Sequence, residues 1–526
     1  MKKLVILLVL ISFVLYQCQL QAQVVERVAI INPAGHAYPS QFSEMNGILY
    51  FSAFTDTHGR ELWRSDGTEA GTYMLKDIQS GTGDSSPSGM TEFNGKIYFS
   101  AGSGSPNDIE LWTSDGTEAG TVLLKNIHPA GSSEPFGFVE YNGYLYFAAK
   151  DDTDAGLWRT DGTLAGTEKI SATNIYTHTA PDIFNEYNGK LYFMADYPGH
   201  AYKLWVTNGT TAGTSQLSTV GAPEQFTVFN GKLYFKGSDG SNDTELWETD
   251  GTEINTKILK NINPTGSSGP WYFYLFNNYL FFSAYDGVNG TELWRSDGTE
   301  AGTIMFKDIE SGFSCSMPES FVEYNNKLYF VAYNSVYGNE VWTTDGIDPV
   351  NNCHLFVDLN TTVSSDPKEL HVSHNKLYFV ADEGSNGHEL WYTDGNPANV
   401  FRIMPDIAPE FSPCFASEFY EMNGVLYFSA AYTSGGLQLY KVTDNSASIN
   451  KPVITELFNI YPNPVVDVLY FSNQTSEEMC IVNAYGQIVM VVEQGLGSIG
   501  VSKLQPGVYF LTSFSSPALR RSFVKL

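Results

Sequence analysis

The chain has 526 residues, of which 17% are charged and 14% aromatic, with 48 glycines and a net charge of −29. This composition is typical of a globular protein built from many short strands and tight turns, and it excludes a disordered chain. It also excludes nucleic acid as a partner, because phosphate binding requires clusters of Lys and Arg that this acidic chain lacks.

The first 22 residues have the pattern of a secretory signal peptide. Two lysines precede an apolar run at 4–16, and Ala22 supplies the small residue that cleavage requires. Cys18 lacks the small preceding residue of a lipoprotein site. We therefore expect Gln23 to be the mature N-terminus and the chain to enter the periplasm. No later stretch reaches the roughly 20 apolar residues of a membrane span, so no span is expected in the mature chain.

A short apolar strand then recurs nine times at intervals of 42 to 49 residues, from 46–51 to 423–428. A second motif, Glu-Leu-Trp-Arg-Ser-Asp-Gly-Thr at 61–68, keeps the same spacing. Its tryptophan recurs at Trp112, Trp158, Trp205, Trp247, Trp294, Trp342 and Trp391, and Tyr440 takes that place in the ninth unit. A fixed period of this length indicates a repeat architecture.

Each unit has the pattern of four short strands. In the second unit we expect them at 88–93, 96–101, 109–114 and 121–127. Asn94-Gly95 and Asp115-Gly116 separate apolar runs, and such dipeptides tolerate the positive φ of tight hairpin turns. The second strand is apolar on consecutive residues, so its sheet must be covered on both faces. Four-stranded sheets packed face to face around an axis provide that cover, which predicts a β-propeller.

The two ends of the repeat region are expected to complete one blade together. The ninth unit has strands at 417–421, 425–430 and 437–442 but no fourth strand, whereas 24–35 resembles the fourth strand and following loop of the second unit. An N-terminal strand in the last blade would remove an open sheet edge. This gives nine blades; an eight-bladed ring with one irregular unit and two smaller rings are the alternatives.

Beyond Asp444 the repeat stops. The expected organisation is a signal peptide at 1–22, the propeller at 23–444, a polar linker at 445–456 and a small β-sandwich at 457–526. The last segment resembles the type A sorting domain of the type IX secretion system of Bacteroidetes, and the landmarks that carry the resemblance are Tyr461, Pro462, Asn463, Pro464, Gly486, Gly507, Tyr509 and Lys525. The resemblance implies that the secretion machinery reads this domain and that the protein is released or attached to the outer-membrane surface.

The repeats themselves resemble the Glu-Leu-Trp-x-x-Asp-Gly-Thr repeat family of secreted bacterial proteins across nearly all of 24–444. This resemblance implies a propeller-like fold and no defined activity.

The repeated polar residues are predicted to be structural. An acid precedes a glycine at the same place in most units, namely at Asp66, Asp115, Asp161, Asp250, Asp297, Asp345 and Asp394, with Asn208 in the fourth. A catalytic carboxylate is needed once, whereas a turn that needs an Asx hydrogen bond is needed in every blade. The tryptophans are likewise expected to pack between blades rather than to stack on sugars.

The loops between the second and third strands vary and are rich in oxygen ligands. Asp151, Asp152 and Asp154 in the third unit are the candidate calcium ligands, although their spacing matches no complete calcium loop and solvated turns are the favoured interpretation. No other cofactor is predicted. His58, His200 and His388 occupy comparable loops too far apart to share a metal, and we expect them on the surface.

The run Trp271-Tyr272-Phe273-Tyr274 breaks the symmetry of the repeat. It could line a central channel, but core packing is the favoured interpretation. No nucleophile elbow, zinc-protease helix or phosphate loop is present. The leading hypothesis is a non-catalytic surface or secreted propeller that binds a glycan or a protein. The alternative is an extracellular polysaccharide hydrolase or lyase with acids from different blades.

Overall fold

The computed structural model describes residues 23–104, 108–171, 174–175, 184–196, 202–240, 243–385, 387–403, 414–431, 436–444, 460–461, 465–471, 479–483, 488–492, 498–513 and 520–525. The chain divides into two compact units, Met1–Asn445 and Ser446–Leu526. The predicted signal peptide and linker lie outside the described residues. The described chain is almost wholly β, with two 3-10 turns, η1 (Thr211–Gly213) and η2 (Glu253–Asn255).

Six sheets of the first unit are antiparallel meanders of four consecutive strands. The first three sheets comprise β2 (Ser40–Met45), β3 (Ile48–Thr55), β4 (Gly59–Ser65) and β5 (Tyr73–Lys76); β6 (Ser88–Phe93), β7 (Lys96–Gly102), β8 (Ile109–Ser114) and β9 (Val122–Lys125); and β10 (Phe136–Tyr141), β11 (Tyr144–Lys150), β12 (Ala155–Thr160) and β13 (Glu168–Ser171). The other three comprise β22 (Trp271–Phe276), β23 (Tyr279–Tyr285), β24 (Thr291–Ser296) and β25 (Ile304–Lys307); β26 (Glu319–Tyr324), β27 (Lys327–Asn334), β28 (Gly338–Thr344) and β29 (Cys353–Val357); and β30 (Lys368–Ser373), β31 (Lys376–Asp382), β32 (His388–Thr393) and β33 (Val400–Arg402).

The hairpin turns have the backbone that the sequence predicts. Asn94 and Gly95 between β6 and β7 have φ of 51° and 74°, and the same pair of positive φ angles recurs in the other first hairpins. Both faces of the second strand are buried, as in β7, where six consecutive residues are buried. Each face packs against a neighbouring sheet; Met45 and Leu62 of the first sheet share a core with Phe99 of the second.

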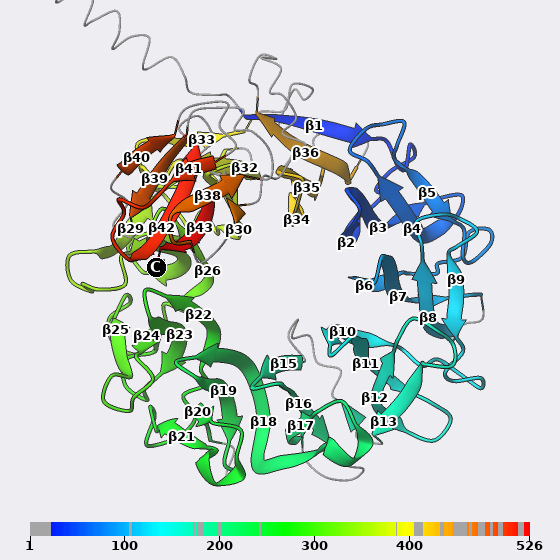
Figure 1. Cartoon of the computed structure of the whole chain (residues 1–526), viewed down its shortest axis with the longest axis horizontal. Helices are drawn as coiled ribbons and strands as arrows, with labels where there is room; N and C mark the ends of the chain where they lie inside the picture. Colours follow the sequence, from blue (N-terminus) through cyan, green and yellow to red (C-terminus); the bar gives the residue numbers. More distant parts are fainter. Residues whose placement is uncertain are drawn as a thin grey trace, which may run out of the picture. The chain divides into compact units, whose positions relative to one another are not determined.

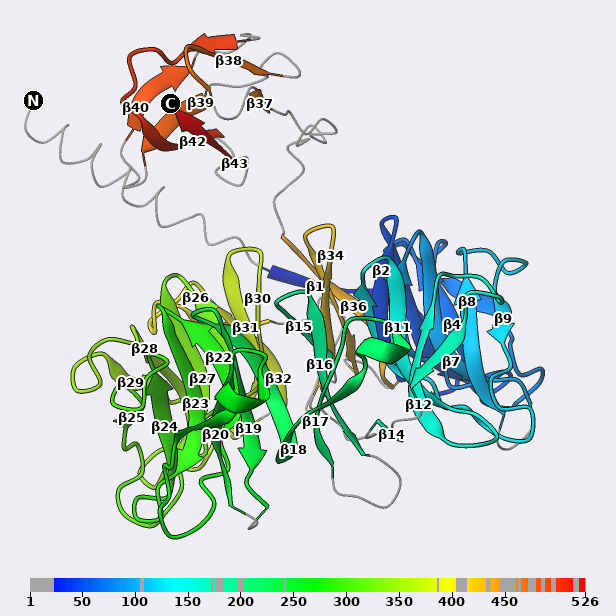
Figure 2. The same ribbon diagram turned by 60° about the horizontal axis from the view of Figure 1, so that its bottom comes forward.

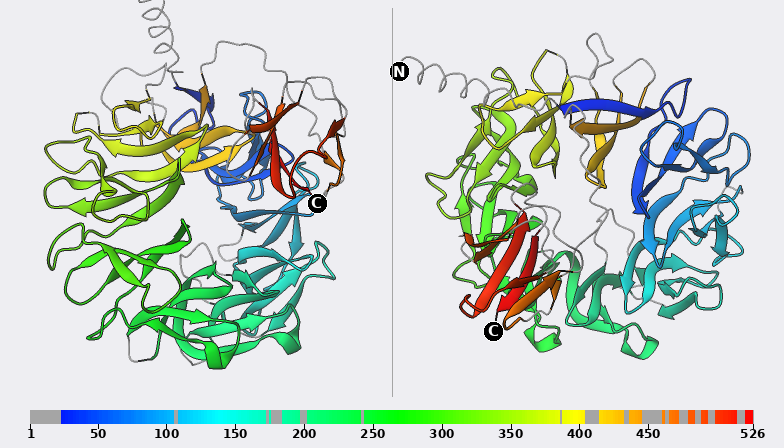
Figure 3. Two further views of the ribbon diagram at one scale, coloured as in Figure 1. Left: turned by 60° about the vertical axis from the view of Figure 1, so that its left-hand side comes forward. Right: turned by 45° about the horizontal axis from the view of Figure 1, so that its top comes forward.

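The sheets follow one another around a common centre, with the first strand of each sheet innermost (Figures 1 and 3). The innermost strand of each described sheet lies beside the innermost strand of the next, from β2 and β6 onward. The innermost strand of the last sheet, β34 (Ser417–Met422), lies beside β2. The arrangement is propeller-like.

One described sheet has eight strands because two units share a strand. It contains β14 (Asn174–Ile175), β15 (Phe184–Tyr187), β16 (Lys190–Asp196), β17 (Lys203–Thr207), β18 (Ser215–Phe229), β19 (Lys232–Ser238), β20 (Thr244–Thr249) and β21 (Lys257–Lys260). The 15-residue β18 pairs with β17 through its first part and with β19 through its second, and Gly221 has partners on both sides. Figure 2 shows β18 running between the two groups of strands.

The N-terminal strand belongs to the last sheet. β1 (Gln23–Ala29) pairs antiparallel with β36 (Gln438–Asp444), which continues to β35 (Val425–Ala430) and β34. The pairing runs from Gln23 opposite Asp444 to Ala29 opposite Leu439. This is the partner that the sequence predicts for the N-terminal strand.

Neighbouring sheets are linked by a tyrosine of the second strand that packs on the Asp-Gly turn of the next sheet. Tyr146 Oη donates a hydrogen bond to the carbonyl of Gly209 at 3.2 Å. The last and first sheets have the same contact, because a Cβ added to Gly67 would lie 2.3 Å from Tyr427 Oη. Lys441 Nζ also donates to the carbonyl of Gly67 at 3.0 Å. The junction between the two ends of the repeat region therefore resembles the others.

The second unit contains two small sheets in its described residues. One has β37 (Ile460–Tyr461), β38 (Val468–Phe471) and β41 (Ser498–Gly500), and the other has β39 (Met479–Asn483), β40 (Ile488–Val492), β42 (Gly507–Ser513) and β43 (Arg520–Lys525). Leu469 of the first sheet and Ile481 and Leu511 of the second are fully buried in one core. Two sheets that enclose one core form the expected sandwich-like layer pair.

Candidate functional site

The repeated Asp-Gly acids are held within their own turns. Asp66 Oδ1 accepts hydrogen bonds from the backbone N–H of Thr68 at 2.9 Å and from its hydroxyl at 2.7 Å. The hydroxyl bond and then the backbone bond lower the pKa of Asp66. The backbone bond recurs at the other predicted turn positions, Asp115, Asp161, Asn208, Asp250, Asp297, Asp345 and Asp394. These side chains fit the structural role expected of them.

The residue five positions after the acid also differs between the turns. A Cβ added to Gly71 would lie 2.0 Å from Asp66 Oδ1, so only glycine fits the first unit's turn with the acid placed as it is. In the fifth unit an asparagine occupies the equivalent place and donates a hydrogen bond instead, from Asn255 Nδ2 to Asp250 Oδ2 at 2.7 Å. With either residue the acid stays bound within its own turn, so it is poorly placed to act on a substrate.

The glutamate of the Glu-Leu-Trp motif is buried and binds a loop, a role that the sequence did not predict. We call it the clip glutamate. Glu61 is fully buried and accepts four hydrogen bonds: from the N–H groups of Ile78, Gln79 and Ser85, at 2.7, 3.3 and 3.2 Å, and from the Ser85 hydroxyl at 2.6 Å. It thus fastens the loop between its own sheet and the next. Equivalent buried residues are Glu110, Glu245, Glu292, Glu340, Glu389 and, in the last sheet, Gln438.

The exceptions show what the clip does. The fourth unit has Lys203 in place of the glutamate, and there β18 runs directly into the next sheet without a loop to hold. In the last sheet Gln438 uses its Oε1 for the N–H of Ile31 and its Nε2 for the carbonyls of Asn32 and Gly35. The third unit is a further exception, because Gly156 takes the place of the acid there.

Burial raises the pKa of the clip glutamates. It raises the pKa of Glu61, Glu292, Glu340 and Glu389 to about 7, against the opposing effect of their hydrogen-bond donors or, for Glu389, of Arg402 and Cys414.

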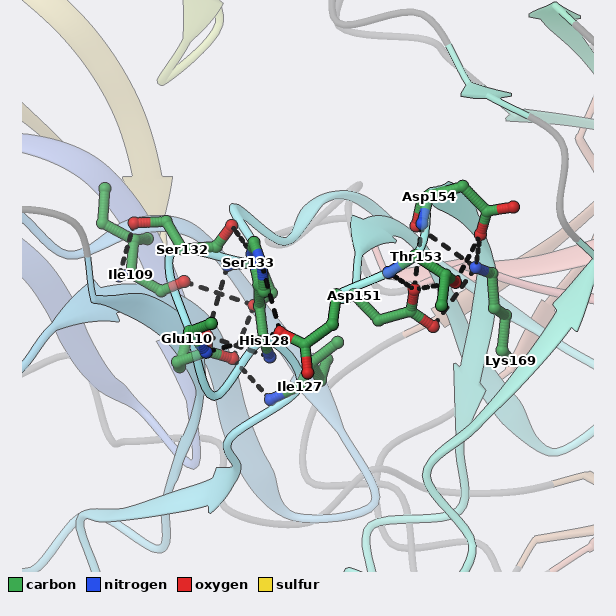
Figure 4. A network of polar contacts seen from close by, with 12 residues as sticks. Ile109, Glu110, Ile127, His128, Ser132, Ser133, Asp151, Thr153, Asp154 and Lys169 are labelled. Carbon is green, nitrogen blue, oxygen red and sulfur yellow. Dashed lines mark hydrogen bonds and ion pairs between the residues drawn. The ribbon is translucent and has the colours of Figure 1, made fainter. Parts of the chain in front are cut away.

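The predicted calcium loop holds a lysine (Figure 4). Lys169 Nζ contacts Asp151 Oδ2 at 3.2 Å and also contacts Asp154 Oδ1. Burial acts to raise the pKa of Asp151, but hydrogen bonds from Thr153, Asp154 and Lys169 hold it well below its usual value. Asp152 points to the neighbouring loop, where its Oδ1 lies 3.3 Å from His128 Nε2.

The three acids therefore do not converge on one point. Lys169 supplies the positive charge that a cation would bring to Asp151 and Asp154, while Asp152 faces His128. Figure 4 also shows the clip of Glu110 beside this loop, with Ile127 and Ser133 as donors. No group of three potential metal ligands occurs among the described residues. Calcium binding at this loop stays a prediction.

His58 and His388 share no metal site among the described residues. His58 is half-buried and its Nδ1 lies 2.8 Å from the hydroxyl of Thr57. His388 is half-buried rather than exposed, because it begins β32 next to the loop that ends at Cys414. His200 lies outside the described residues. The described cysteines are free thiols.

The aromatic run divides between core and surface, so the expectation that it packs in the core is wrong for its first two residues. Phe273 and Tyr274 pack against buried clusters, whereas Trp271 and Tyr272 are 39% and 46% exposed on the innermost strand β22. Lys236 Nζ lies 3.6 Å from the centre of the Trp271 ring and 2.7 Å from Glu224 Oε2. The ion pair holds the indole from one side.

Tyr272 belongs to a set of innermost residues with a left-handed backbone, which we call the inner bulge positions. In each case the pairing of the innermost strand shifts register at this residue, as between Trp271 and Tyr274. The described members are Gln41, Gly89, Gly137, Gln225, Tyr272, Ser320, Glu369 and Glu418, with φ between 55° and 67°. A residue other than glycine in this conformation costs about 1–2 kcal/mol.

Some of these side chains link neighbouring strands. Gln41 Oε1 accepts the N–H of Gly89 at 2.9 Å, and Gln225 Oε1 accepts the N–H of Tyr272 at 3.0 Å. Glu418 Oε2 accepts the N–H of Gln41 at 3.3 Å. These bonds give the two glutamines and Glu418 a structural role.

Tyr272 and Glu369 project instead from the innermost strands. Burial and then the Glu319 carboxylate of the next sheet raise the pKa of the Tyr272 hydroxyl. Glu369 is exposed, yet the surrounding strands exclude enough water to raise the pKa of its carboxyl, and the Glu418 carboxylate adds to this shift. The exposed aromatic pair therefore lies on β22, and the two acids lie on β30 and β34, with β26 between the two groups.

The predicted sorting landmarks are partly described. Tyr461 lies in β37, Gly507 begins β42, and Tyr509 in β42 is buried and donates its hydroxyl to the carbonyl of Gln505 at 2.9 Å. Lys525 is buried near the end of β43. Pro462, Asn463, Pro464 and Gly486 lie outside the described residues.

Within the described ranges, the chain forms no α-helix with the length and apolarity that crossing a membrane requires. No curated protein sequence matches the chain.

Several solved structures share a weak likeness. One is a puromycin hydrolase at 12% identity and a TM-score of 0.32, covering 68% of this chain and 58% of the hydrolase. A puromycin-hydrolysing peptidase of Mycobacterium tuberculosis has 11% identity and a TM-score of 0.35, with coverages of 66% and 57%. The chain spans less than two thirds of both enzymes. PorZ, a surface component of the type IX secretion system of Porphyromonas gingivalis, has 11% identity, a TM-score of 0.24 and coverages of 93% and 82%. Likenesses this weak do not indicate what the chain does.

The C-terminal unit gives a specific match. Residues 459–518 match the secretion system C-terminal sorting domain family. This segment contains most of the landmarks that the sequence analysis identified. The protein therefore carries a sorting domain of the type IX secretion system, which directs its export to the outside of the cell or to the cell surface.

Proposed function

We propose that the protein is a nine-bladed β-propeller, closed by its N-terminal strand, that binds a ligand outside the cell and catalyses no reaction. The succession of innermost strands from β2 to β34 and the pairing of β1 with β36 support the closed ring. The resemblance of the repeats to the Glu-Leu-Trp-x-x-Asp-Gly-Thr family agrees with it. The type IX secretion machinery is the partner during export.

The observation that carries the binding role is the exposure of Trp271 and Tyr272 on β22. Large aromatic side chains contribute most of the contact energy at binding surfaces and are usually buried otherwise. The tryptophans of the repeated motif, by contrast, are buried or half-buried. The turn acids and the clip glutamates are all occupied by hydrogen bonds within the fold, whereas the side chains of the innermost strands differ between the repeats.

The test is retention of the labelled mature protein on the extracellular material of its own bacterium. We expect a Trp271→Ser, Tyr272→Gly double variant to lose retention. Serine occupies the position of Trp271 in β2, β6 and β34, and glycine occupies that of Tyr272 in β6 and β10, so both changes suit the fold. Tyr38→Gly is the matched control, because Tyr38 is another exposed aromatic residue with positive φ and Gly269 occupies its place in the sixth unit.

Equal retention of the double variant and the control would contradict the proposed site. Release of soluble sugars from the extracellular material by the wild-type protein would instead support the enzymatic alternative.

A further inference from the structure

The inner bulge positions differ in chemistry around the ring. In the first three units they are Gln41, Gly89 and Gly137. The two glycines have no side chain, and the Gln41 amide is used in a hydrogen bond to Gly89. From the fifth unit to the ninth they are Gln225, Tyr272, Ser320, Glu369 and Glu418. One side of the innermost surface therefore carries side chains and the other is nearly bare.

Tyr272 is not explained by the fold. Its φ of 60° is strained for tyrosine, and glycine satisfies the same bulge in the second and third units. The residue is 46% exposed, so burial offsets only part of the strain. A bulky residue that is kept in a left-handed conformation without a packing reason indicates a role outside the fold.

The neighbours of Tyr272 form a mixed aromatic and hydrogen-bonding surface. Trp271 precedes it, with one side of its indole held by the Lys236 ammonium. The Glu319 carboxylate lies near enough to the Tyr272 hydroxyl to raise its pKa, and the hydroxyl of Ser320 and the carboxyl of Glu369 occupy the next two inner bulge positions. The innermost strands that carry these residues, β22, β26 and β30, lie side by side.

This combination suits a sugar chain. The C–H faces of sugar rings stack on aromatic rings, and their hydroxyl groups donate hydrogen bonds to carboxylates. An anionic polymer is disfavoured, because the exposed Glu369 and Glu418 and the net charge of −29 would repel it. Lys236, beside Trp271, is buried and paired with Glu224, so the exposed Lys368 next to Glu369 is the cation that this surface offers.

We infer that the surface formed by Trp271, Tyr272, Ser320 and Glu369 binds an uncharged glycan chain, with the aromatic pair as the stacking platform and the acid as hydrogen-bond acceptor. This inference rests on the proposed binding function and adds the chemical class of the ligand.

The test is titration of the mature protein with uncharged hexasaccharides of glucose, mannose and xylose, measured by calorimetry and by tryptophan emission. Hexagalacturonate and unstructured acidic and basic peptides are the competing ligand classes. We expect saturable binding of at least one uncharged hexasaccharide and none of hexagalacturonate. Tyr272→Gly should weaken binding about tenfold or more without lowering the melting temperature, since glycine fits this backbone. Glu369→Gln should weaken it less, and Tyr38→Gly should not change it.

The outcomes separate the two levels of the argument. Binding of a peptide or of hexagalacturonate that depends on Tyr272, with no uncharged sugar bound, would overturn the inference and leave the proposed function standing. Absence of any ligand whose binding depends on Trp271 or Tyr272 would overturn both. Sugar binding that survives Tyr272→Gly would assign the sugar to another surface and overturn the inference.

Discussion

The hydroxyl of Tyr378 donates a hydrogen bond to Oε1 of Gln23 at 2.8 Å, across 355 positions of the chain. In the preceding sheet the equivalent Tyr329 faces the carbonyl of Gly395 in an Asp-Gly turn. The last sheet has no such turn, because its two outer strands come from opposite ends of the repeat region. The side chain of the first residue of β1 takes the place of the missing turn.

Deleting Val24–Asn32 should therefore destabilise the first unit. The deletion removes the buried side chains of Val25, Val28 and Ile31, each worth about 1.5–3 kcal/mol, and it exposes the edge of β36. We expect a lower melting temperature by calorimetry and association by light scattering. Tyr378→Phe is the mild comparison and should cost about 1 kcal/mol. A deletion variant that melts with the parent would contradict the shared sheet.

The clip glutamates predict a pH-dependent stability. Their pKa is raised from 4.5 to about 7 in Glu61, Glu292, Glu340 and Glu389, so the folded protein holds protons that the unfolded chain has released. Below pH 4.5 these groups therefore make their full contribution to the free energy of unfolding. That contribution should be lost as the pH rises towards 7. The turn acids act in the opposite direction but only near and below their ordinary pKa of 3.8.

The measurement is the melting temperature between pH 5 and 8 for the wild type and for a variant with these four glutamates changed to glutamine. Glutamine occupies this place naturally at Gln438, where it clips the corresponding loop without titrating. We expect the wild type to melt at a lower temperature at pH 8 than at pH 5 and the variant to show a flatter profile. Parallel profiles would show that other groups cause the pH dependence.

Calcium should stabilise the wild type no more than a simple salt does, because Lys169 already neutralises Asp151 and Asp154. Lys169→Met leaves these carboxylates without their cation and should create a calcium-specific rise in the melting temperature. Ligand binding to the folded state alone adds about 2.7 kcal/mol at a hundred times the dissociation constant. A calcium-specific rise in the wild type that is lost when Asp151, Asp152 and Asp154 become Asn would show that the loop binds the metal as it stands.

Removing residues 457–526 should leave the protein in the periplasm, because this segment contains the sorting domain. The expected result is loss of the protein from the cell surface and the medium, with recovery in the periplasmic fraction, measured by immunoblotting. Full-length Tyr272→Gly is the control and should be exported normally. Unchanged surface levels of the truncated protein would mean that export does not depend on the sorting domain.

The repeat made much of the fold predictable. Three of the four strands expected in the second unit begin at the predicted residue, because Asn94-Gly95 fixes the first hairpin and the apolar run after it fixes the second strand. The N-terminal strand was predictable for a related reason, since its sequence repeats that of an internal fourth strand. Turn type and periodicity both depend on residues that are close in sequence, so both can be predicted without the structure.

The binding surface was harder to predict. The sequence predicts Trp271 and Tyr272 in the core because aromatic residues in strands are usually buried. The register shift within β22 turns Tyr272 towards solvent instead. Lys169 comes after Asp151 and Asp154 in sequence and lies on the far side of a hairpin, so its ion pairs depend on strand register that spacing alone does not give. The clip glutamates were visible as a motif but not as buried groups.

The shared strand β18 has a mechanical consequence. Wherever two sheets are joined by a loop, a protease can cut the loop without opening either sheet, and the two sheets can separate while each stays intact. Between the fourth and fifth units there is no loop to cut, and Gly221 is paired on both sides. Cleavage or forced separation at this point must break backbone hydrogen bonds in both sheets at once, so this seam should be the last place at which neighbouring sheets separate.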